Sequence, residues 1–221
     1  MESLGRLAWR ELAERLTDMI LSGELKPGHR LVETEIADQF NISRGPVRTA
    51  LMHLGGRGLV EVRAPRGIFV VTLTGRDVQE LYAVRMALEE AAIREVAGRP
   101  DLDESWPEIE RHLEYLDAAA ADREFEAVTS REDLAFHRSL VELSGNRRLL
   151  SFWDELAGQI LLIMGTLQNK DIPEIWPLLH DHRRIHDALR SEDPLRGVAR
   201  LHDHLIRTRD FMIVVVERES K

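Results

Sequence analysis

Apolar residues recur at intervals of three and four along the first 20 positions of the chain. This spacing follows the 3.6-residue turn of a helix, so we predict an N-terminal helix with one buried face. Gly23 suits the residue that ends this helix, and Pro27-Gly28 prevents its continuation. The apolar positions are Leu4, Leu7, Ala8, Leu12, Leu16, Met19 and Ile20.

Two shorter apolar patterns follow, and a tight turn separates them. The first predicts a helix over residues 34–40, and the second predicts a helix from Arg44 to about Leu54. Asn41 lies between them, where a tight turn needs a residue that tolerates a positive φ. Ser43 is a favourable N-cap for the second helix. Two short helices joined in this way form a helix-turn-helix.

The pattern then changes from helical spacing to alternation. Leu59–Arg63 and Ile68–Val71 predict two strands around a turn at Ala64-Pro65-Arg66-Gly67. A hairpin directly after a helix-turn-helix is a wing. We therefore predict a winged helix-turn-helix domain over residues 1–72, followed by a linker over residues 73–76.

The remaining residues, 77–221, show helical spacing almost throughout and no strand pattern. They predict an all-α antiparallel helical bundle, so the fold class of the whole chain is mostly α. We expect Thr74 to cap the first helix of the bundle, and we expect a break near Val128 in the third. The expected helices cover residues 74–97, 103–120, 122–144, 146–167, 173–191 and 194–218.

The charged residues divide the chain at the same place. The formal net charge is −9, yet residues 1–75 carry ten Lys or Arg against nine Asp or Glu, whereas residues 76–221 carry 20 against 30. The sequence has no cysteine, which excludes disulfides and Cys-ligated metal sites. It shows no signal-peptide pattern and no apolar run near the roughly 18 residues of a membrane span. We predict a cytoplasmic protein with no membrane contact.

The arginines of the N-terminal domain gather on the second helix of the helix-turn-helix and on the wing. Arg44 and Arg48 are four residues apart and share the helix face that enters a major groove. An arginine can donate two hydrogen bonds to guanine or to a phosphate, and the Ser43 hydroxyl suits a phosphate oxygen. Arg63 and Arg66 could reach the neighbouring DNA backbone or minor groove. The alternative is a solvated basic face that binds no nucleic acid.

The N-terminal segments resemble the winged-helix domain of GntR-family bacterial transcription regulators. The matching segments are "GELKPGHRL", "ETEIA", "ISRGPVRTAL", "GLV" and "RGIFV", and the resemblance covers residues 4–72. Thr34 stands where relatives can carry a DNA-contacting arginine, and Asn41 stands where glycine is commoner. The resemblance implies that double-stranded operator DNA is the partner. The expected DNA-binding residues are Thr34, Ser43, Arg44, Arg48, Arg63, Arg66 and Gly67.

A carboxylate and several imidazoles predict a metal site in the helical bundle. Asp133 and His137 are four residues apart, so they share one face of a helix. A carboxylate and neutral imidazoles suit divalent Zn, Ni, Mn or Fe. Two simpler interpretations stay open: a surface pair of Asp133 and His137, and a separate pair of His182 and His186. The other candidate imidazoles are those of His180, His202 and His204.

The helical region resembles the FCD effector domain of the FadR-type branch of the same family, and its short length is similar to the VanR-like variant. "DLAFH", "DHRRIHDAL" and "HDHL" are similar to the metal-binding segments of that domain. The resemblance implies a small organic acid effector whose carboxylate completes the coordination of the metal. His180, His186 and His202 fall outside the pattern. The implied metal ligands are Asp133, His137, His182 and His204.

Two further residues match the FCD pattern, and each has a simpler alternative role. Arg85, in "VRMALEEAA", is expected to hold the carboxylate of the effector, or else to form an ion pair with Glu89 one turn later. Asn146, in "SGNRRLL", is expected to bind the effector, or else to cap the helix that follows it.

These features together predict a transcription regulator, of the repressor type, that binds an operator as a homodimer. The homodimer is expected because a palindromic site mirrors a two-fold axis. One alternative is a direct sensor of the divalent metal. A remote alternative is a metal-dependent hydrolase with Glu132 or Glu142 as general base, although no motif supports either acid. We therefore expect no enzymatic activity.

Overall fold

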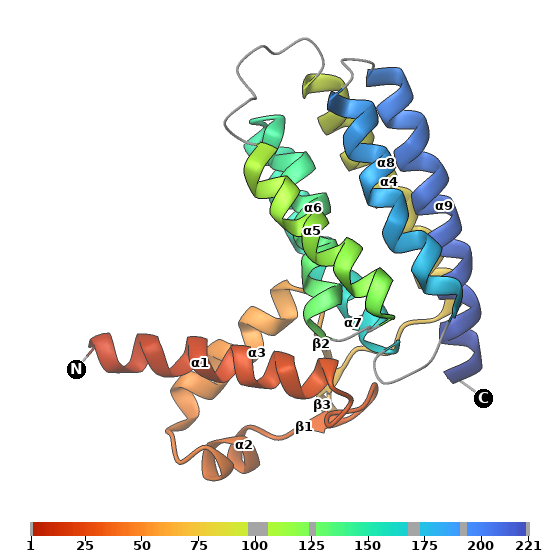
Figure 1. The fold of residues 1–221 in the computed structure, drawn as a ribbon. Helices are drawn as coiled ribbons and strands as arrows, with labels where there is room; N and C mark the ends of the chain where they lie inside the picture. The colour runs from red at the N-terminus through yellow and green to blue at the C-terminus, as the bar shows by residue number, and fades with distance from the viewer. Residues whose placement is uncertain (1, 97–105, 124–126, 168–172, 191–193, 220–221) are drawn as a thin grey trace.

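The computed structural model of the chain describes residues 2–96, 106–123, 127–167, 173–190 and 194–219. A unit of three helices and a small sheet lies at one end of the molecule, and a helical bundle forms the other end (Figure 1). The predicted fold class, mostly α with a winged helix-turn-helix before a helical bundle, is confirmed. No helix in the described ranges is long and apolar enough to cross a membrane.

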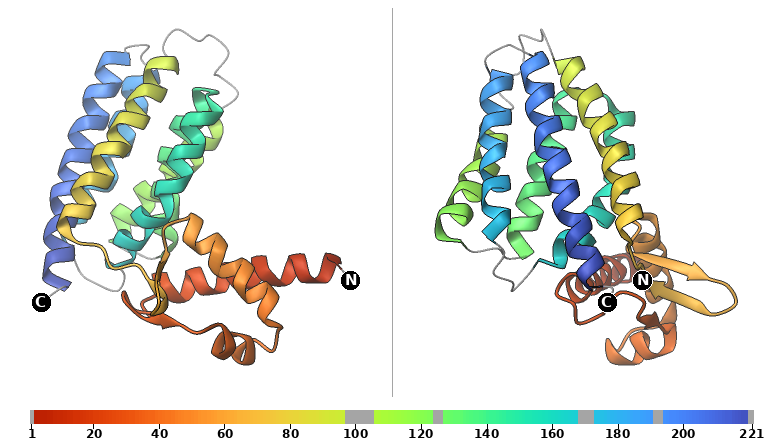
Figure 2. Two further views of the ribbon diagram at one scale, coloured as in Figure 1. Left: turned by 180° about the vertical axis from the view of Figure 1, so that it is seen from behind. Right: turned by 90° about the vertical axis from the view of Figure 1, so that its right-hand side faces the viewer.

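The N-terminal unit contains three helices and a three-stranded antiparallel sheet. The strands follow the order β1-β3-β2, and Arg63 pairs with Gly67 at the end of the hairpin. The hairpin projects from the body of the molecule in the right-hand view of Figure 2. The sequence analysis missed β1, because a strand of two residues shows no alternation. The elements are α1 (Glu2–Leu21), β1 (Arg30–Leu31), α2 (Glu33–Gln39), α3 (Arg44–Gly56), β2 (Val60–Arg63) and β3 (Gly67–Val70).

The helix-turn-helix packs around an apolar core. Helix α3 buries Val47, Leu51 and Leu54 in the same cluster as residues of α1, and burial of each such side chain contributes roughly 1.5–3 kcal/mol. Asn41 has a φ of 50°, as the predicted turn requires. Ser43 occupies the N-cap position of α3, but its side chain makes no capping hydrogen bond, so the expected cap contact is absent.

The C-terminal bundle contains six α-helices among the described residues. Helix α9 packs against α4 and α8, while α6 packs against α4, α5 and α7. Thr74 caps α4 as predicted, since its Oγ1 accepts from the backbone N–H of Asp77 and its own N–H donates to the Asp77 carboxylate. The helices are α4 (Gly75–Val96), α5 (Trp106–Asp122), α6 (Ala127–Leu143), α7 (Arg147–Gly165), α8 (Trp176–Arg190, after a 3₁₀ turn at Pro173–Ile175) and α9 (Pro194–Glu219).

The break predicted near Val128 falls at the start of α6, which begins at Ala127 and continues to Leu143. Helix α5 ends at Asp122, two residues later than predicted, and Arg123 follows it with a positive φ of 56°. A left-handed residue stops a helix, and arginine gives no sequence signal for that conformation. The predicted start of α5 at residues 103–105, and the breaks predicted around residues 98–103, 169–172 and 191–193, lie outside the described residues.

Candidate metal centre and nucleic-acid interface

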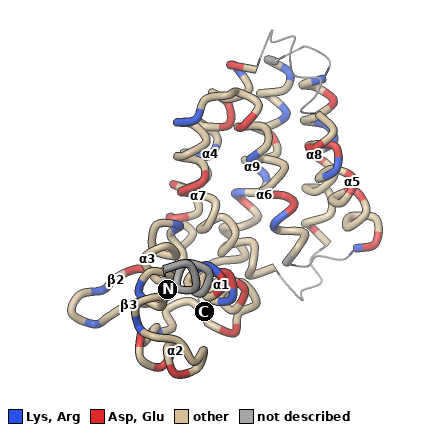
Figure 3. Tube along the Cα trace, turned by 90° about the vertical axis from the view of Figure 1, so that its left-hand side faces the viewer, with Lys and Arg blue, Asp and Glu red and all other residues tan. Residues whose placement is uncertain are grey.

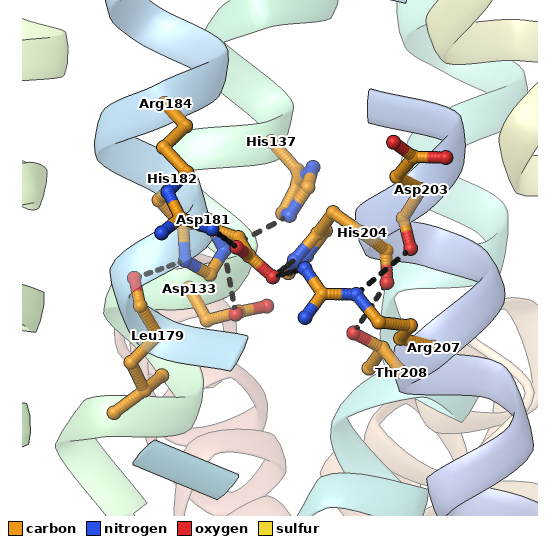
Figure 4. Close-up of polar contacts among 10 residues, drawn as sticks. All are labelled: Asp133, His137, Leu179, Asp181, His182, Arg184, Asp203, His204, Arg207 and Thr208. Atoms are coloured by element: carbon orange, nitrogen blue, oxygen red, sulfur yellow. Dashed lines mark hydrogen bonds and ion pairs between the residues drawn. The ribbon is translucent and has the colours of Figure 1, made fainter. Parts of the chain in front are cut away.

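Four potential metal ligands from three helices meet in the core of the bundle. Asp133 and His137 come from α6, His182 from α8 and His204 from α9. One ligand atom from each lies within 4.8 Å of the others, and all four side chains are buried. Figure 4 shows them converging between the helices. The structure thus brings together the four residues that the FCD resemblance implies.

The packing of α6 turns its ligands toward the core. Phe136 is fully buried, and the edges of its ring meet the rings of His137 and His182 at centroid distances of 5.2 and 4.9 Å. Asp133 lies one helical turn before His137, so both project to the same side of α6. The interpretation of Asp133 and His137 as a surface pair therefore does not describe this structure.

Two hydrogen bonds determine which ring nitrogens carry protons. The Nδ1 of His137 lies 2.7 Å from the Glu89 carboxylate, and the Nδ1 of His182 lies 2.9 Å from the carbonyl oxygen of Leu179. A carbonyl oxygen and an ionised carboxylate can only accept, so each Nδ1 is the donor. The Nε2 atoms of His137 and His182 consequently turn lone pairs toward the centre of the cluster.

These lone pairs face one another at a distance that a bound cation or a shared proton would bridge. The two Nε2 atoms are 3.1 Å apart, and Asp133 Oδ1 lies 2.9 Å from the Nε2 of His182. A proton on the Nε2 of His182 would bridge to Asp133, but it would leave the buried ring nitrogens of His204 without a hydrogen-bond partner. Nitrogens that both lie about 2.1 Å from one divalent ion are roughly 3.0–3.4 Å apart. The observed spacing fits a metal ion.

His204 supplies the strongest indication that a ligand belongs here. Both of its ring nitrogens are buried and make no hydrogen bond to the described residues. Its Nδ1 faces Oδ2 of the buried Asp181 at 3.9 Å, and Arg207 also pairs with that carboxylate (Figure 4). A carboxylate behind a histidine orients the ring for metal binding. Asp181 in turn borders a surface depression of about 380 Å³ that is lined mainly by charged side chains of α8 and α9.

The protonation states also favour metal binding. Burial, reinforced by the neighbouring His182, lowers the pKa of His204 to about 3. Burial, together with the charge of Arg85, lowers the pKa of His137. Burial opposes ionisation of Asp133, but His182 and His137 outweigh it, so the pKa of this carboxyl is lowered as well. Near neutral pH, Asp133 is thus a carboxylate, and His137 and His204 are neutral imidazoles, the forms that bind metals.

Arg85 lies beside this cluster and is completely buried. Its Nε donates to Glu89 at 2.7 Å, so the ion-pair alternative for Arg85 describes a real contact. Its Nη2, however, is buried without a hydrogen-bond partner among the described residues, and so is the hydroxyl of the neighbouring Tyr82. Two buried donors without an acceptor could both donate hydrogen bonds to an anionic ligand.

Asn146 lies at the N-terminus of α7. Its side-chain oxygen accepts from the backbone N–H groups of Arg148 and Leu149, and its amide nitrogen donates to Glu95. The helix-capping alternative therefore describes its contacts, and it is not a member of the buried metal-binding group.

The other histidines and acids considered from the sequence have partners elsewhere. His186 lies 3.3 Å from Glu110, and His202 lies 2.9 Å from Glu90. The proposed separate pair of His182 and His186 is thus not a metal-binding group in this structure. Glu132 contacts His112, and Glu142 pairs with Arg138, so neither acid is free to act as a general base at the cluster. His180 is largely exposed.

The expected DNA-reading face is exposed on α3. The side chains of Arg44 and Arg48 are 61% and 63% accessible. Glu33, at the start of α2, accepts one hydrogen bond from Arg44 and two from Arg48, all between 3.1 and 3.2 Å. These contacts lower the pKa of Glu33, with Arg48 as the larger cause. Ser43 and Thr34 are also exposed at this end of the unit.

The wing carries a second group of arginines. Arg63 pairs with Glu61 at 2.6 Å, and Arg66 is exposed at the turn. Figure 3 shows basic positions along the hairpin of β2 and β3. Gly67 has a φ of 117°, which side-chain-bearing residues rarely adopt. A Cβ at Gly67 would lie 3.3 Å from the guanidinium of Arg30, so β1 adds a further arginine at the hairpin.

Sequence reasoning missed three residues that hold the site residues in place. Glu89 was considered only as a partner of Arg85, yet it also accepts from His137. Asp181 directly precedes His182, and that adjacency was its only signal. Glu33 is separated from Arg44 by a turn, so its pairing depends on how α2 packs on α3.

Comparisons with known proteins agree with this arrangement. Residues 9–70 match the family described as "Bacterial regulatory proteins, gntR family", and residues 80–207 match "FCD domain". The chain is 30% identical over 179 residues to the "Uncharacterized HTH-type transcriptional regulator YdhC" of Bacillus subtilis (strain 168), covering 81% of this chain and 79% of that protein.

Two further similarities extend over most of the chain. It is 33% identical over 195 residues to the "Probable D-xylose utilization operon transcriptional repressor" of Paenarthrobacter nicotinovorans, covering 86% of this chain and 83% of that protein. The crystal structure of a GntR transcriptional regulator from Rhodococcus sp. RHA1 superposes with a TM-score of 0.75 at 25% identity, covering 93% and 97% of the two chains.

Proposed function

The chain belongs to the GntR family of bacterial transcription regulators and carries the FCD domain of its FadR-type branch, and we propose that it is a repressor controlled by a small carboxylate held at a divalent metal ion. The family consists of regulators that bind DNA rather than of enzymes. The metal, the effector and the homodimer are the parts of this function that we infer for this chain.

The observation that carries the proposal is the set of four buried, convergent ligand atoms. The Nδ1 protons of His137 and His182 are committed to Glu89 and Leu179, so their Nε2 lone pairs are left for a cation. The buried ring nitrogens of His204 have no hydrogen-bond partner among the described residues. One carboxylate and three imidazoles suit Zn, Ni, Mn or Fe. When bound, such an ion would supply a Lewis-acidic centre for the oxygens of a ligand.

Arg85 supports a carboxylate as that ligand. Its free Nη2 is buried beside the cluster, and burial makes a charged hydrogen bond to an anion stronger than it would be in water. The Tyr82 hydroxyl is a second free donor nearby. One relative is named as the repressor of a gluconate operon, so sugar acids are the first carboxylates to test.

Operator binding is assigned to α3 and the wing. Arg44 and Arg48 project from the N-terminal half of α3, where a recognition helix meets base edges, and Ser43 stands at the helix N-terminus, where a phosphate binds. Arg63 and Arg66 on the hairpin suit the neighbouring backbone or minor groove. Thr34 and Gly67 complete the proposed interface, Gly67 by permitting the turn.

A homodimer matches the two-fold symmetry of palindromic operators. Two large apolar side chains are exposed on neighbouring helices of the bundle, Val84 on α4 at 48% and Phe152 on α7 at 56%. An interface through α4 and α7 would cover both of them. Size-exclusion chromatography with light scattering tests this assignment, and a Phe152→Glu variant is expected to weaken the dimer.

Metal analysis of the purified protein tests the metal centre. We expect one divalent ion per chain in the wild type and a strong loss in His204→Ala. His180→Ala is the matched control, because His180 is an exposed histidine outside the cluster, and it is expected to keep the ion. Equal metal content in the two variants would show that the ion binds elsewhere.

A direct metal sensor is the second candidate. It is favoured by the ion pair of Arg85 with Glu89, which already balances the charge of the arginine. In that case operator affinity would respond to the metal and to no carboxylate, and Arg85→Ala would leave the response intact. A carboxylate-responsive repressor requires the opposite result for this variant.

A further inference from the structure

A buried carboxylate connects the metal cluster to helix α7. Glu89 accepts from the Nδ1 of His137 at 2.7 Å, and its other oxygen accepts from Trp153 Nε1 at 3.0 Å and from Arg85 Nε at 2.7 Å. Glu89, His137, Arg85 and Trp153 are all at most 1% exposed. Any event that moves His137 or Arg85 therefore acts on the acceptor that holds Trp153.

The opposite part of α7 is packed directly against the DNA-binding unit. A Cβ placed at Gly158 would lie 2.0 Å from the carbonyl oxygen of Arg57, and one placed at Gly165 would lie 3.0 Å from the carbonyl oxygen of Leu21. These glycines are seven residues apart, so they lie on the same face of α7. The backbone of α7 thus approaches the backbone of the other unit with no side chain between them.

Arg57 and Leu21, which these two glycines approach, lie at the ends of helices in the DNA-binding unit. Arg57 is the C-cap of the proposed recognition helix α3, and Leu21 is the last residue of α1. Leu162 of α7 lies between the two glycines in sequence and is buried in the apolar core of the DNA-binding unit. A movement of α7 would consequently displace the ends of α1 and α3 together.

A single rigid element therefore connects the two sites. Trp153 and Gly158 are five residues apart on the continuous helix Arg147–Gly165. A close-packed helix passes on a displacement as a unit, because interiors are dense and cannot absorb the movement.

From this arrangement we propose that α7 couples the metal centre to the recognition helix, with Trp153 as the positioning residue that links it to Glu89. The proposal rests on the proposed function and adds the route by which that site regulates DNA binding. The indole N–H of Trp153 donates to Glu89, so Trp153 acts through Glu89 on one side and through the glycine face of α7 on the other.

The first test removes the indole N–H and keeps an aromatic ring. Zn²⁺ alone serves as the probe, and the DNA is an operator fragment selected from a random pool by the wild-type protein. In the wild type, Zn²⁺ is expected to change the DNA Kd by about fivefold or more, the lower end of typical coupling. Trp153→Phe is expected to bind Zn²⁺ and metal-free DNA like the wild type, while the ratio of its two DNA Kd values falls to about one.

Trp176→Phe is the matched control. Trp176 is also a buried tryptophan of the bundle, but its indole N–H has no hydrogen-bond partner among the described residues. This variant is expected to keep the wild-type ratio. A full ratio in Trp153→Phe, or a ratio of one in wild type that binds Zn²⁺, would overturn the proposal.

The second test acts at the other end of α7 and does not depend on metal. Gly158→Ala is expected to change the operator Kd severalfold in the metal-free protein, because Arg57 must move to admit the methyl group. Gly56→Ala is the control, since a Cβ there meets nothing within 4 Å. Circular dichroism and a Zn²⁺ titration establish that the bundle of each variant is intact.

The two tests separate failure of the coupling from failure of the metal site. If the wild type binds no Zn²⁺, the proposed metal centre is wrong, and the Gly158→Ala variant still decides whether the α7 contact controls DNA affinity. An unchanged operator Kd in Gly158→Ala overturns the coupling role of α7 whatever the metal result.

Discussion

Glu33 holds Arg44 and Arg48, the two arginines of α3 that we propose contact DNA. Its carboxylate accepts from both Arg44 and Arg48 at 3.1–3.2 Å, so the guanidinium groups are aligned before DNA arrives. An exposed ion pair of this kind contributes at most about 1 kcal/mol. Contacts of the arginines with guanine or phosphate can therefore replace the ion pair. Glu33 orients Arg44 and Arg48 but binds them too weakly to prevent such contacts.

Arg48→Ala is expected to weaken operator binding by about 1–3 kcal/mol, the usual loss for one arginine that reads a guanine. Fluorescence anisotropy with a labelled operator measures the change. Arg76→Ala is the matched control, because Arg76 is 85% exposed on α4 and pairs only with Glu80. If both variants bind like the wild type, α3 does not read the operator in the orientation proposed.

Asp181 is expected to act through His204, the proposed metal ligand that it faces. Its carboxylate faces the Nδ1 of His204, so Asp181→Asn should reduce metal affinity by about 10–100-fold, the range seen when such supporting carboxylates are lost. Isothermal titration with the metal measures the effect. Asp203→Asn, an exposed acid lining the same surface depression, is the control and should bind metal normally. Equal affinities would remove Asp181 from the site.

At the scale of the helices, α7 combines a polar cap, a tryptophan and a glycine face. The side-chain oxygen of Asn146 accepts hydrogen bonds from two backbone N–H groups in the first turn of α7. These bonds satisfy donors that the start of a helix leaves unpaired. Trp153 and Gly158 follow on the same helix. The helix is therefore held at its beginning, in the bundle core and at the DNA-binding unit.

Asn146→Ala is expected to destabilise the protein by about 1 kcal/mol, the typical loss of an N-cap. Thermal melting measures it, and Asn146→Asp should retain most of the stability because aspartate also caps. The temperature shift produced by a bound carboxylate should stay the same in both variants. Loss of that shift with normal stability would instead make Asn146 an effector ligand.

The helices and the hairpin were predictable because apolar residues recur at regular intervals over most of their length. The spacing of Val47, Leu51 and Leu54 is enough to place α3 and its buried face. A strand of two residues such as β1 is too short to show alternation of polar and apolar residues. The left-handed backbone conformation at Arg123 gives no sequence signal, because arginine is not a residue that favours it. Local spacing therefore gives the elements but not their irregular ends.

The candidate site was only partly accessible from the sequence. The pair Asp133 and His137 is visible because both lie on one helix, whereas the convergence of His182 and His204 depends on how three helices pack. Nothing in the spacing shows that Glu89 joins the cluster to Trp153, or that Gly158 touches Arg57. These contacts arise between elements far apart in the chain, so only tertiary structure reveals them.

At the scale of the whole molecule, the two units differ in the groups that they bury. Each unit has its own apolar cluster, with Leu162 of α7 joining that of the DNA-binding unit and Leu21 of α1 joining that of the bundle. The bundle encloses the buried histidines and acids that form the candidate site. Stability should therefore depend on pH mainly through the bundle.

Acidification is expected to destabilise the metal-free protein. The folded pKa values of His137 and His204 lie below the ordinary value of 6.5, so the unfolded chain binds more protons below that pH. Their contribution is complete above about pH 6.5 and decreases as the pH falls toward the folded pKa. The buried acids Asp133 and Glu89, whose pKa values are lowered, add to this loss only below their own ordinary values near 4.

Thermal melting between pH 7.5 and pH 5 measures this dependence, and the melting temperature should fall. His204→Phe should flatten the slope, whereas His180→Phe should not, because His180 is largely exposed. An equal slope in wild type and His204→Phe would mean that the buried His204 is not responsible.

The most direct test of the central claim is thermal melting of the metal-loaded protein against a panel of sugar acids and other small carboxylates. A ligand at about 100 times its Kd stabilises by roughly 2.7 kcal/mol, which raises the melting temperature by several degrees in a chain of this size. The proposed function predicts at least one such carboxylate, with the shift abolished by a chelator and by Arg85→Ala. A shift that persists in both conditions, or metal-loaded protein that responds to no carboxylate while metal alone changes operator affinity, would contradict it.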